Sequence, residues 1–216
     1  MALPDRPRLV ALGDSMTQGR DDPAPGGGWR GWVPRLARQL GIPRDTVANT
    51  AAEGATAADV VERQIPRVRN ARPGIVAFIC GMNDITGSGD AAESKRGCEA
   101  LLSWAAGTGA LVLTSGVVPC WEKLPVSRVR RSRLQRDVAR FNHDLAALAA
   151  AHGASCLDPA VLPEARDPAM WAGDGIHLSP LGHQVIAREF TRLVRQRLPL
   201  EASARLSLGL GLEVGT

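Results

Sequence analysis

Short apolar runs alternate along this chain with longer segments in which apolar residues recur every three or four positions. A continuous apolar run bounded by turn residues predicts a buried strand, and the three-to-four spacing predicts an amphipathic helix. Runs of the first kind predict five strands, at about residues 8–12, 45–51, 74–80, 110–114 and 154–158. The second pattern predicts helices at about residues 29–40, 57–68, 91–106, 134–148 and 180–197.

Two prolines bear on the ends of these helices. Pro66 lies inside the predicted helix at residues 57–68, and because proline has no backbone N–H we expect it to end or kink that helix. Pro180 stands near the first turn of the last predicted helix, where proline is well tolerated.

Strands that alternate with helices indicate an α/β fold. We expect one five-stranded parallel sheet with helices on both faces, joined by right-handed crossovers in a three-layer α/β/α sandwich. In such sheets a ligand binds at the carboxyl ends of the strands. A chain of 216 residues suits one domain, which we place at residues 1–199. Residues 200–216 have little periodicity and several glycines, so we expect a mobile or loosely packed C-terminal tail.

The net charge of +4 at pH 7 raises the question of nucleic-acid binding. The cations are almost all arginines, spread along the chain and interleaved with acids, and only Lys95 and Lys123 are lysines. This pattern is more typical of a high-GC genome, and we expect no nucleic-acid partner. Without an apolar stretch of about 18 residues we expect no membrane insertion. Residues 1–8 lack the pattern of a signal peptide, which favours a cytoplasmic location.

Cysteines and histidines give no indication of a metal site. Cys80, Cys98, Cys120 and Cys156 are scattered without a C-x-x-C pair, so we expect free thiols. The four histidines show no zinc-ligand spacing with them.

Candidate chemistry begins at Ser15, which follows the first predicted strand within the sequence Gly-Asp-Ser-Met-Thr-Gln-Gly at residues 13–19. A serine needs a base to take its proton, and the base needs a partner that fixes its tautomer and stabilises its charged form. Asp174 and His177, three residues apart, supply both residue types. We therefore expect Ser15 to be a nucleophile, His177 its base and Asp174 the residue that orients the base.

Two further blocks lie between these ends, Asn-Thr-Ala-Ala-Glu-Gly-Ala-Thr at residues 49–56 and Gly-Met-Asn-Asp at residues 81–84. With four short blocks in this order, the chain resembles a bacterial, single-domain member of the Ser-Gly-Asn-His hydrolase family, the GDSL-type esterases and lipases. The resemblance spans about residues 8–195. Met16 replaces the leucine of the family name, at a position that we expect to serve packing.

The resemblance implies a flavodoxin-like fold and a carboxylic ester hydrolase that needs no cofactor. It implies a catalytic triad of Ser15, Asp174 and His177. It assigns three donors to the oxyanion of the tetrahedral intermediate: the backbone N–H of Ser15, the backbone N–H of Gly54 and the side-chain amide of Asn83. The partner it implies is a small-molecule acyl ester, and we expect short acyl groups to be preferred.

Each of these residues also has an ordinary structural role open to it: a helix N-cap for Ser15, a hydrogen-bonded loop position for His177, a turn for Gly54 and a loop cap for Asn83. Arg128 leads a run of five arginines that is either a solvated helix start or a contact for an acidic substrate. Trp121 and Trp171 flank the site segments and line the substrate pocket or pack in the core.

Two alternative functions remain open at this point. A thioesterase or an acyltransferase would use the same residues, since the difference lies in the leaving group and in the exclusion of water. A catalytically silent binding module on the same fold is the alternative from another class, and the presence of Ser15, Asn83, Asp174 and His177 argues against it.

Overall fold

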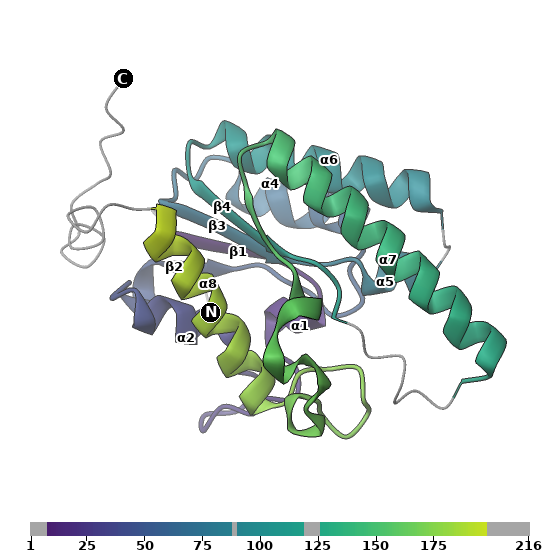
Figure 1. The fold of residues 1–216 in the computed structure, drawn as a ribbon. Coiled ribbons are helices and arrows are strands. Elements are labelled where there is room, and N and C mark those ends of the chain that lie inside the picture. Colours follow the sequence, from purple (N-terminus) through teal and green to yellow (C-terminus); the bar gives the residue numbers. More distant parts are fainter. Residues whose placement is uncertain (1–7, 88–89, 119–125, 198–216) are drawn as a thin grey trace.

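The sheet at the centre of the molecule has five parallel strands in the order β2-β1-β3-β4-β5 (Figure 1). The structure is a computed structural model that describes residues 8–87, 90–118 and 126–197. The strands are β1 (Leu9–Gly13), β2 (Val47–Asn49), β3 (Ile75–Ile79), β4 (Leu111–Ser115) and β5 (Ser155–Leu157). Each overlaps one of the five predicted strands, which confirms the parallel α/β fold.

Helices cover both faces of the sheet, and the alternation of side chains along β1 shows how each face is buried. The main helices are α2 (Trp32–Gln39) and α8 (Pro180–Arg197) on one face, and α6 (Ala91–Gly107) and α7 (Arg128–Ala151) on the other (Figure 1). Leu9 and Ala11 belong to the apolar core that contains residues of α2 and α8. Val10 and Leu12 belong to the core that contains residues of α6 and α7.

The segment around Pro66 stays helical but changes its winding. It consists of α3 (Ala57–Asp59), the π-helical turn η2 (Val60–Gln64) and α4 (Ile65–Val68), where Pro66 occupies an early position. A π turn is wider than an α turn, so it leaves room for a proline ring that would collide with the preceding turn of an α-helix. Pro66 therefore does not end the helix; it follows a local change of helix type.

Several short helices escaped prediction because four or five residues are too few to show a period. The single-turn helices α1 (Ser15–Gln18) and α5 (Met82–Thr86) follow β1 and β3 directly. The remaining short elements are 3-10 helices: η1 (Arg44–Thr46), η3 (Pro159–Val161), η4 (Pro163–Arg166) and η5 (Pro168–Met170). The two single-turn helices lie at the carboxyl ends of adjacent central strands, where a ligand is expected.

The boundaries of two long helices also differ from the prediction. Helix α2 begins at Trp32, because its N-cap Gly31 has φ 68, a left-handed conformation outside a helix. Helix α7 begins at Arg128, six residues before the first residue of its apolar stripe, with Ser127 as a side-chain N-cap. The polar first turns of α7 carry no apolar period, so a prediction from apolar spacing could not include them.

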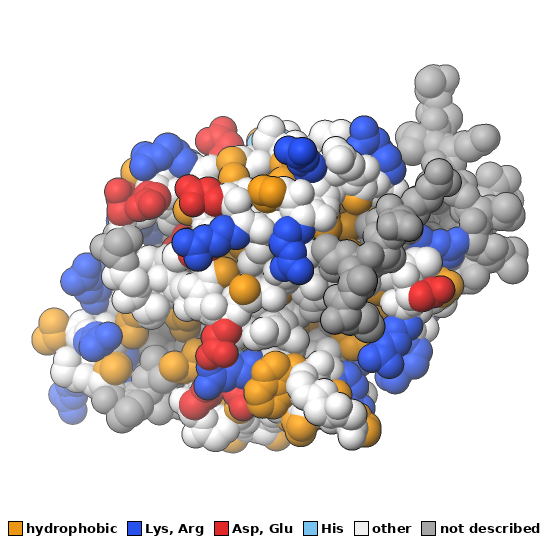
Figure 2. All heavy atoms as spheres, turned by 180° about the vertical axis from the view of Figure 1, so that it is seen from behind, with side chains coloured by type: hydrophobic (Ala, Val, Ile, Leu, Met, Phe, Trp, Pro, Cys, Tyr) orange, Lys and Arg blue, Asp and Glu red, His pale blue; other side chains and the backbone are white. Residues whose placement is uncertain are grey.

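The charged residues are scattered over the surface. On the face seen in Figure 2, lysine and arginine side chains are separated by acidic, neutral and apolar ones. No helix in the described ranges is long and apolar enough to cross a membrane. Cys80, Cys98 and Cys156 are free thiols. Cys120, Trp121 and the expected tail at residues 200–216 lie outside the described residues.

Candidate active site

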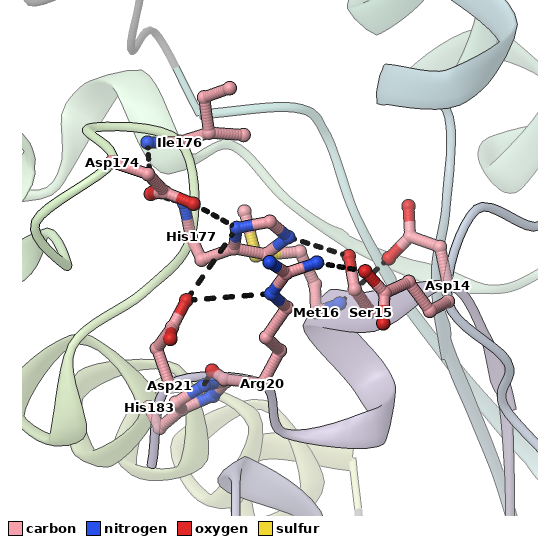
Figure 3. Close-up of polar contacts among 10 residues, drawn as sticks. Asp14, Ser15, Met16, Arg20, Asp21, Asp174, Ile176, His177 and His183 are labelled. Carbon is pink, nitrogen blue, oxygen red and sulfur yellow. Dashed lines mark hydrogen bonds and ion pairs between the residues drawn. The ribbon is translucent and has the colours of Figure 1, made fainter.

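Ser15, His177 and Asp174 form a chain of hydrogen bonds across the carboxyl end of the sheet (Figure 3). The Oγ of Ser15 lies 2.9 Å from Nε2 of His177, and Nδ1 of the same ring lies 2.5 Å from Oδ2 of Asp174. An ionised carboxylate only accepts, so the Nδ1–H donates to Asp174 and Nε2 is left to accept from the serine hydroxyl. This is the arrangement in which an imidazole can remove a proton from Ser15.

Asp174 also builds the turn that presents His177. Its Oδ1 accepts hydrogen bonds from the backbone N–H groups of Ile176 at 2.9 Å and of His177 at 3.0 Å, while Oδ2 accepts from the imidazole. Burial raises the pKa of Asp174, but the His177 side chain and these two N–H groups outweigh it and hold the pKa at about 2. Asp174 is therefore a carboxylate at neutral pH.

Ser15 is held by the turn between β1 and α1. Asp14, and not Ser15, is the N-cap of α1, and its Oδ1 accepts from the backbone N–H of Met16 at 2.9 Å. Burial raises the pKa of Asp14 to about 7, against the lowering effect of that hydrogen bond. Gly13 before it has φ 129, and a Cβ there would collide with the carbonyl oxygen of Ile79. A side chain at residue 13 would therefore push β1 away from β3.

The two other oxyanion candidates lie on neighbouring segments. Asn83 is on α5, where its Nδ2 donates to the carbonyl oxygen of Ala55 at 3.0 Å and lies 3.5 Å from Oδ2 of Asp14. Gly54 is exposed in the turn after β2 with φ 76, one residue from Ala55. The Asn83 hydrogen bond thus ties the Gly54 turn to α5.

A cavity of about 180 Å³ lies beside the serine. Ser15, Asn83 and His177 line it, but Gly54 does not. Its apolar lining comes from Met16, Met82, Leu134, Val138 and Ile176. Leu134 and Val138 belong to the apolar stripe of α7, which indicated a helix but gave no sign of a cavity. A second, apolar cavity of about 20 Å³ shares Met16 and Met82 with the first.

The two substrate-binding candidates that the structure describes, Trp171 and Arg128, lie away from this cavity. Trp171 is buried in the core shared with α2 and α8 and pairs with Leu178 in an isolated bridge. Arg128 is exposed at the first residue of α7. Trp121 is not among the described residues. Neither Trp171 nor Arg128 lines the cavity described above.

The loop after α1 adds residues that no motif indicated. Oδ2 of Asp21 lies 3.6 Å from Nδ1 of His177, on the same side of the ring as Asp174 (Figure 3). Arg20 forms an ion pair with Glu53 and lies 3.7 Å from Asp21. Nε2 of His183 on α8 donates to the carbonyl oxygen of Arg20 at 2.9 Å. The only sign in the sequence was the position of Asp21 shortly after the serine block.

Asp21, Asp174 and His177 are also the group in the described ranges whose ligand atoms lie close enough to hold a metal ion, within 4.8 Å of one another. A cation there would have to displace the proton between Nδ1 and Asp174, which are 2.5 Å apart. The donor set therefore fits an acid–imidazole pair better than a metal centre.

Comparison with known proteins supports the same family. Residues 11–185 match the model of the GDSL-like lipase/acylhydrolase family. No curated protein matches the chain. Among solved structures, TesA is 21% identical, with 88% of this chain and 99% of that chain covered at a TM-score of 0.68. The acetyl xylan esterase AlAXEase is 20% identical, with 86% and 99% covered at a TM-score of 0.64.

A GDSL-like lipase from Bacteroides thetaiotaomicron VPI-5482 is 18% identical, with 88% of this chain and 89% of that chain covered at a TM-score of 0.64. At these identities the three solved structures share the fold of this chain. They carry no information on its substrate.

Proposed function

We propose, from the premise that the chain belongs to the GDSL-like lipase/acylhydrolase family, that it is a serine esterase for short-chain acyl esters. The observation that carries the proposal is the hydrogen-bonded chain from Ser15 through His177 to Asp174. It supplies a nucleophile, a base and a charged partner for the base, and the first two line the same cavity.

The proposed reaction has two steps that use the same base. Nε2 of His177 takes the hydroxyl proton as Oγ of Ser15 attacks the acyl carbon, and then gives it to the departing alcohol. Water, activated by the same nitrogen, attacks the acyl-enzyme and restores Ser15. Asp174 stays ionised throughout and stabilises the imidazolium that forms in each step.

The oxyanion of each tetrahedral intermediate needs donors on the other side of the acyl carbon. We assign this role to the backbone N–H groups of Ser15 and Gly54 and to the side-chain amide of Asn83. The support for Asn83 is its place in the same cavity as Ser15 and its Nδ2 group. The support for Gly54 is its open turn beside Ala55, to which Asn83 is bonded.

The size of the cavity supports a short acyl group. A buried cavity of about 150 Å³ is enough to hold benzene, which has six carbons. The cavity beside Ser15 measures about 180 Å³ and is mostly apolar. An acyl chain from acetyl to about hexanoyl therefore matches the volume that the described residues enclose.

The experiment that tests the function combines labelling with a substrate panel. We expect a fluorophosphonate to add its mass at Ser15, and Ser15→Ala to take up no label while unfolding at the same denaturant concentration as wild type. Failure to label Ser15 in folded protein would instead favour the silent binding module.

The panel compares p-nitrophenyl esters from acetyl to palmitoyl with acyl-CoA thioesters. An esterase gives higher kcat/KM for the esters after allowance for the better nitrophenolate leaving group. Faster turnover of the thioesters would favour a thioesterase. Transfer of the acyl group to an added alcohol in preference to water would favour an acyltransferase.

A further inference from the structure

We propose that Asp21 is a second carboxylate of the catalytic centre, a positioning residue that acts through His177 together with Asp174. The proposal rests on the esterase function and extends it to a residue outside the four family blocks. The juxtaposition that carries it is the distance of 3.6 Å between Oδ2 of Asp21 and Nδ1 of His177.

At this distance Asp21 acts by its charge rather than by a hydrogen bond. Nδ1 already donates to Asp174 at 2.5 Å, so the proton points to that partner. The side chain of His177 is only 12% exposed, and the side chain of Asp21 is 33% exposed. A charge this close to a mostly buried imidazole is incompletely screened by water and favours the protonated ring.

The backbone of Asp21 is held in an unusual conformation. Its φ of 65 makes it the one non-glycine residue with positive φ in the part of the chain that the structure describes. Such a conformation costs free energy for residues with a Cβ and persists where surrounding contacts enforce it, often at functional sites. Aspartate and asparagine tolerate it better than most residues.

The residues on either side of Asp21 supply those contacts. On one side, the carbonyl oxygen of Arg20 accepts a hydrogen bond from Nε2 of the buried His183 at 2.9 Å. On the other side, Asp22 is buried, forms an ion pair with Arg35 and accepts from the backbone N–H of Gly31 at 3.0 Å. The loop is thus fixed to α8 and to the start of α2, which fixes where the Asp21 carboxylate points.

The nearest cation, Arg20, is shared between Asp21 and a second carboxylate. Nε of Arg20 is 3.7 Å from Oδ2 of Asp21 (Figure 3). Its Nη1 forms an ion pair with Glu53 in direct contact. Glu53 therefore shares the charge of Arg20. Arg20 thus offsets the charge of Asp21 only in part, and the remaining charge acts on the imidazole.

This charge has its largest effect when the ring is protonated. In the transition state His177 takes the serine proton and becomes an imidazolium, which two carboxylates stabilise better than one. The charged and titratable groups that face the ring are Asp174 on its own turn, Asp21 and Arg20 on the loop after α1, Ser15 and Asp14 on the β1–α1 turn, and His183 on α8.

The first test replaces the charge and keeps the shape. We expect Asp21→Asn to lower kcat for p-nitrophenyl acetate about two- to fivefold, the usual size of a partly exposed charge interaction, with KM unchanged. The acid limb of the pH profile should move to lower pH, since the protonated ring loses one partner. The matched control is Asp45→Asn, at an exposed acid in η1 before β2, and it should change neither kcat nor the acid limb of the pH profile.

The second test separates positioning from structure. Asp21→Gly removes both the carboxylate and the strain of a positive φ, so it should unfold at the same or a higher temperature than wild type while losing the same two- to fivefold in kcat. If Asp21 served only the backbone conformation of its loop, Asp21→Gly would keep the kcat of wild type.

A third readout follows the imidazole directly, because Asp14 has a pKa of about 7 and its own titration also enters the pH profile of kcat. NMR of the His177 ring should show its titration at lower pH in Asp21→Asn than in Asp45→Asn. If wild type hydrolyses no ester and takes up no fluorophosphonate, the esterase function fails and this role fails with it. If wild type is active but Asp21→Asn matches Asp45→Asn in rate and titration, only the proposal for Asp21 is overturned.

Discussion

The side-chain amide of Gln64 makes two hydrogen bonds with the backbone of Gly13, one from the Gly13 N–H to Oε1 at 2.9 Å and one from Nε2 to the Gly13 carbonyl oxygen at 2.8 Å. Gln64 is the last residue of the π-helical turn and is buried. It holds the last residue of β1 two positions before Ser15. The change of helix type at Pro66 thus accompanies a contact that supports the proposed nucleophile.

Replacing Gln64 should therefore affect both stability and activity. In Gln64→Ala the N–H of Gly13 loses its partner, at a cost of about 1–3 kcal/mol for a buried group left unsatisfied. The Gly13 carbonyl oxygen still accepts from the backbone N–H of Ala52 at 3.1 Å. We expect a lower midpoint of urea unfolding and a lower kcat with little change in KM. Gln184→Ala, an exposed glutamine on α8, is the control. An unchanged kcat in folded Gln64→Ala would contradict the link to Ser15.

The proposed oxyanion role of Asn83 predicts an effect on turnover. Removing one oxyanion donor typically costs about 10²–10³ in kcat. We expect Asn83→Ala to show a loss of this order, with KM for short esters within about threefold of wild type. Complete labelling of Ser15 by a fluorophosphonate shows that the nucleophile of Asn83→Ala is intact. The reaction is given more time if the variant is labelled more slowly than wild type. An increase in KM with unchanged kcat would assign Asn83 to substrate binding.

The buried carboxyl of Asp14 predicts a dependence of stability on pH. Its folded pKa of about 7 lies above the ordinary value of 3.8. The folded state therefore holds the proton more tightly, and Asp14 reduces stability progressively as the pH rises from about 4 to about 7. Asp14→Asn keeps an oxygen for the Met16 N–H and removes this penalty.

We expect Asp14→Asn to gain stability relative to wild type between about pH 4 and about pH 8, by up to about 4 kcal/mol. Urea unfolding of both proteins at the two pH values measures the difference. If the difference in the free energy of unfolding between the two proteins is the same at about pH 4 and at about pH 8, Asp14 ionises with its ordinary pKa.

The wall of the cavity beside Ser15 predicts the preferred acyl length. Leu134 on α7 lines it and is only partly buried, so its replacement leaves the core of α7 in place. Leu134→Ala should shift the preference toward longer acyl groups and Leu134→Trp toward acetyl, with each methylene worth about 1–3 kcal/mol. The ratio of kcat/KM for hexanoyl and acetyl esters measures the shift. Equal ratios in both variants would place the acyl group elsewhere.

The strands and long helices could be predicted because their residues repeat over many positions. The apolar run at residues 74–80 appears as β3 (Ile75–Ile79), and the stripe from Leu134 to Leu148 lies within α7. The proximity of Ser15 and His177 followed from the four sequence blocks and the rule that ligands bind at the carboxyl ends of parallel strands. Both inferences use patterns that are local or shared with a family.

Other parts of the site depend on contacts between distant residues, and these leave no local pattern. Asp21 faces His177 because His183 and the buried Asp22 hold its loop. Gln64 reaches Gly13 because a π turn directs it toward β1. Neither contact involves residues spaced at a helix or strand period, so neither could be read from the sequence.

The sequence separation of 162 positions between Ser15 and His177 has a consequence for the chain as it leaves the ribosome. Until residues 171–197 have emerged, the sheet can already carry the serine, but the base and its carboxylate are missing. The last helix must then pack against α2 to bring His177 to the serine. In the proposed mechanism a nascent or prematurely terminated chain that lacks residues 171–197 cannot cleave esters, and hydrolysis begins only after this segment has been synthesised and has packed on the sheet.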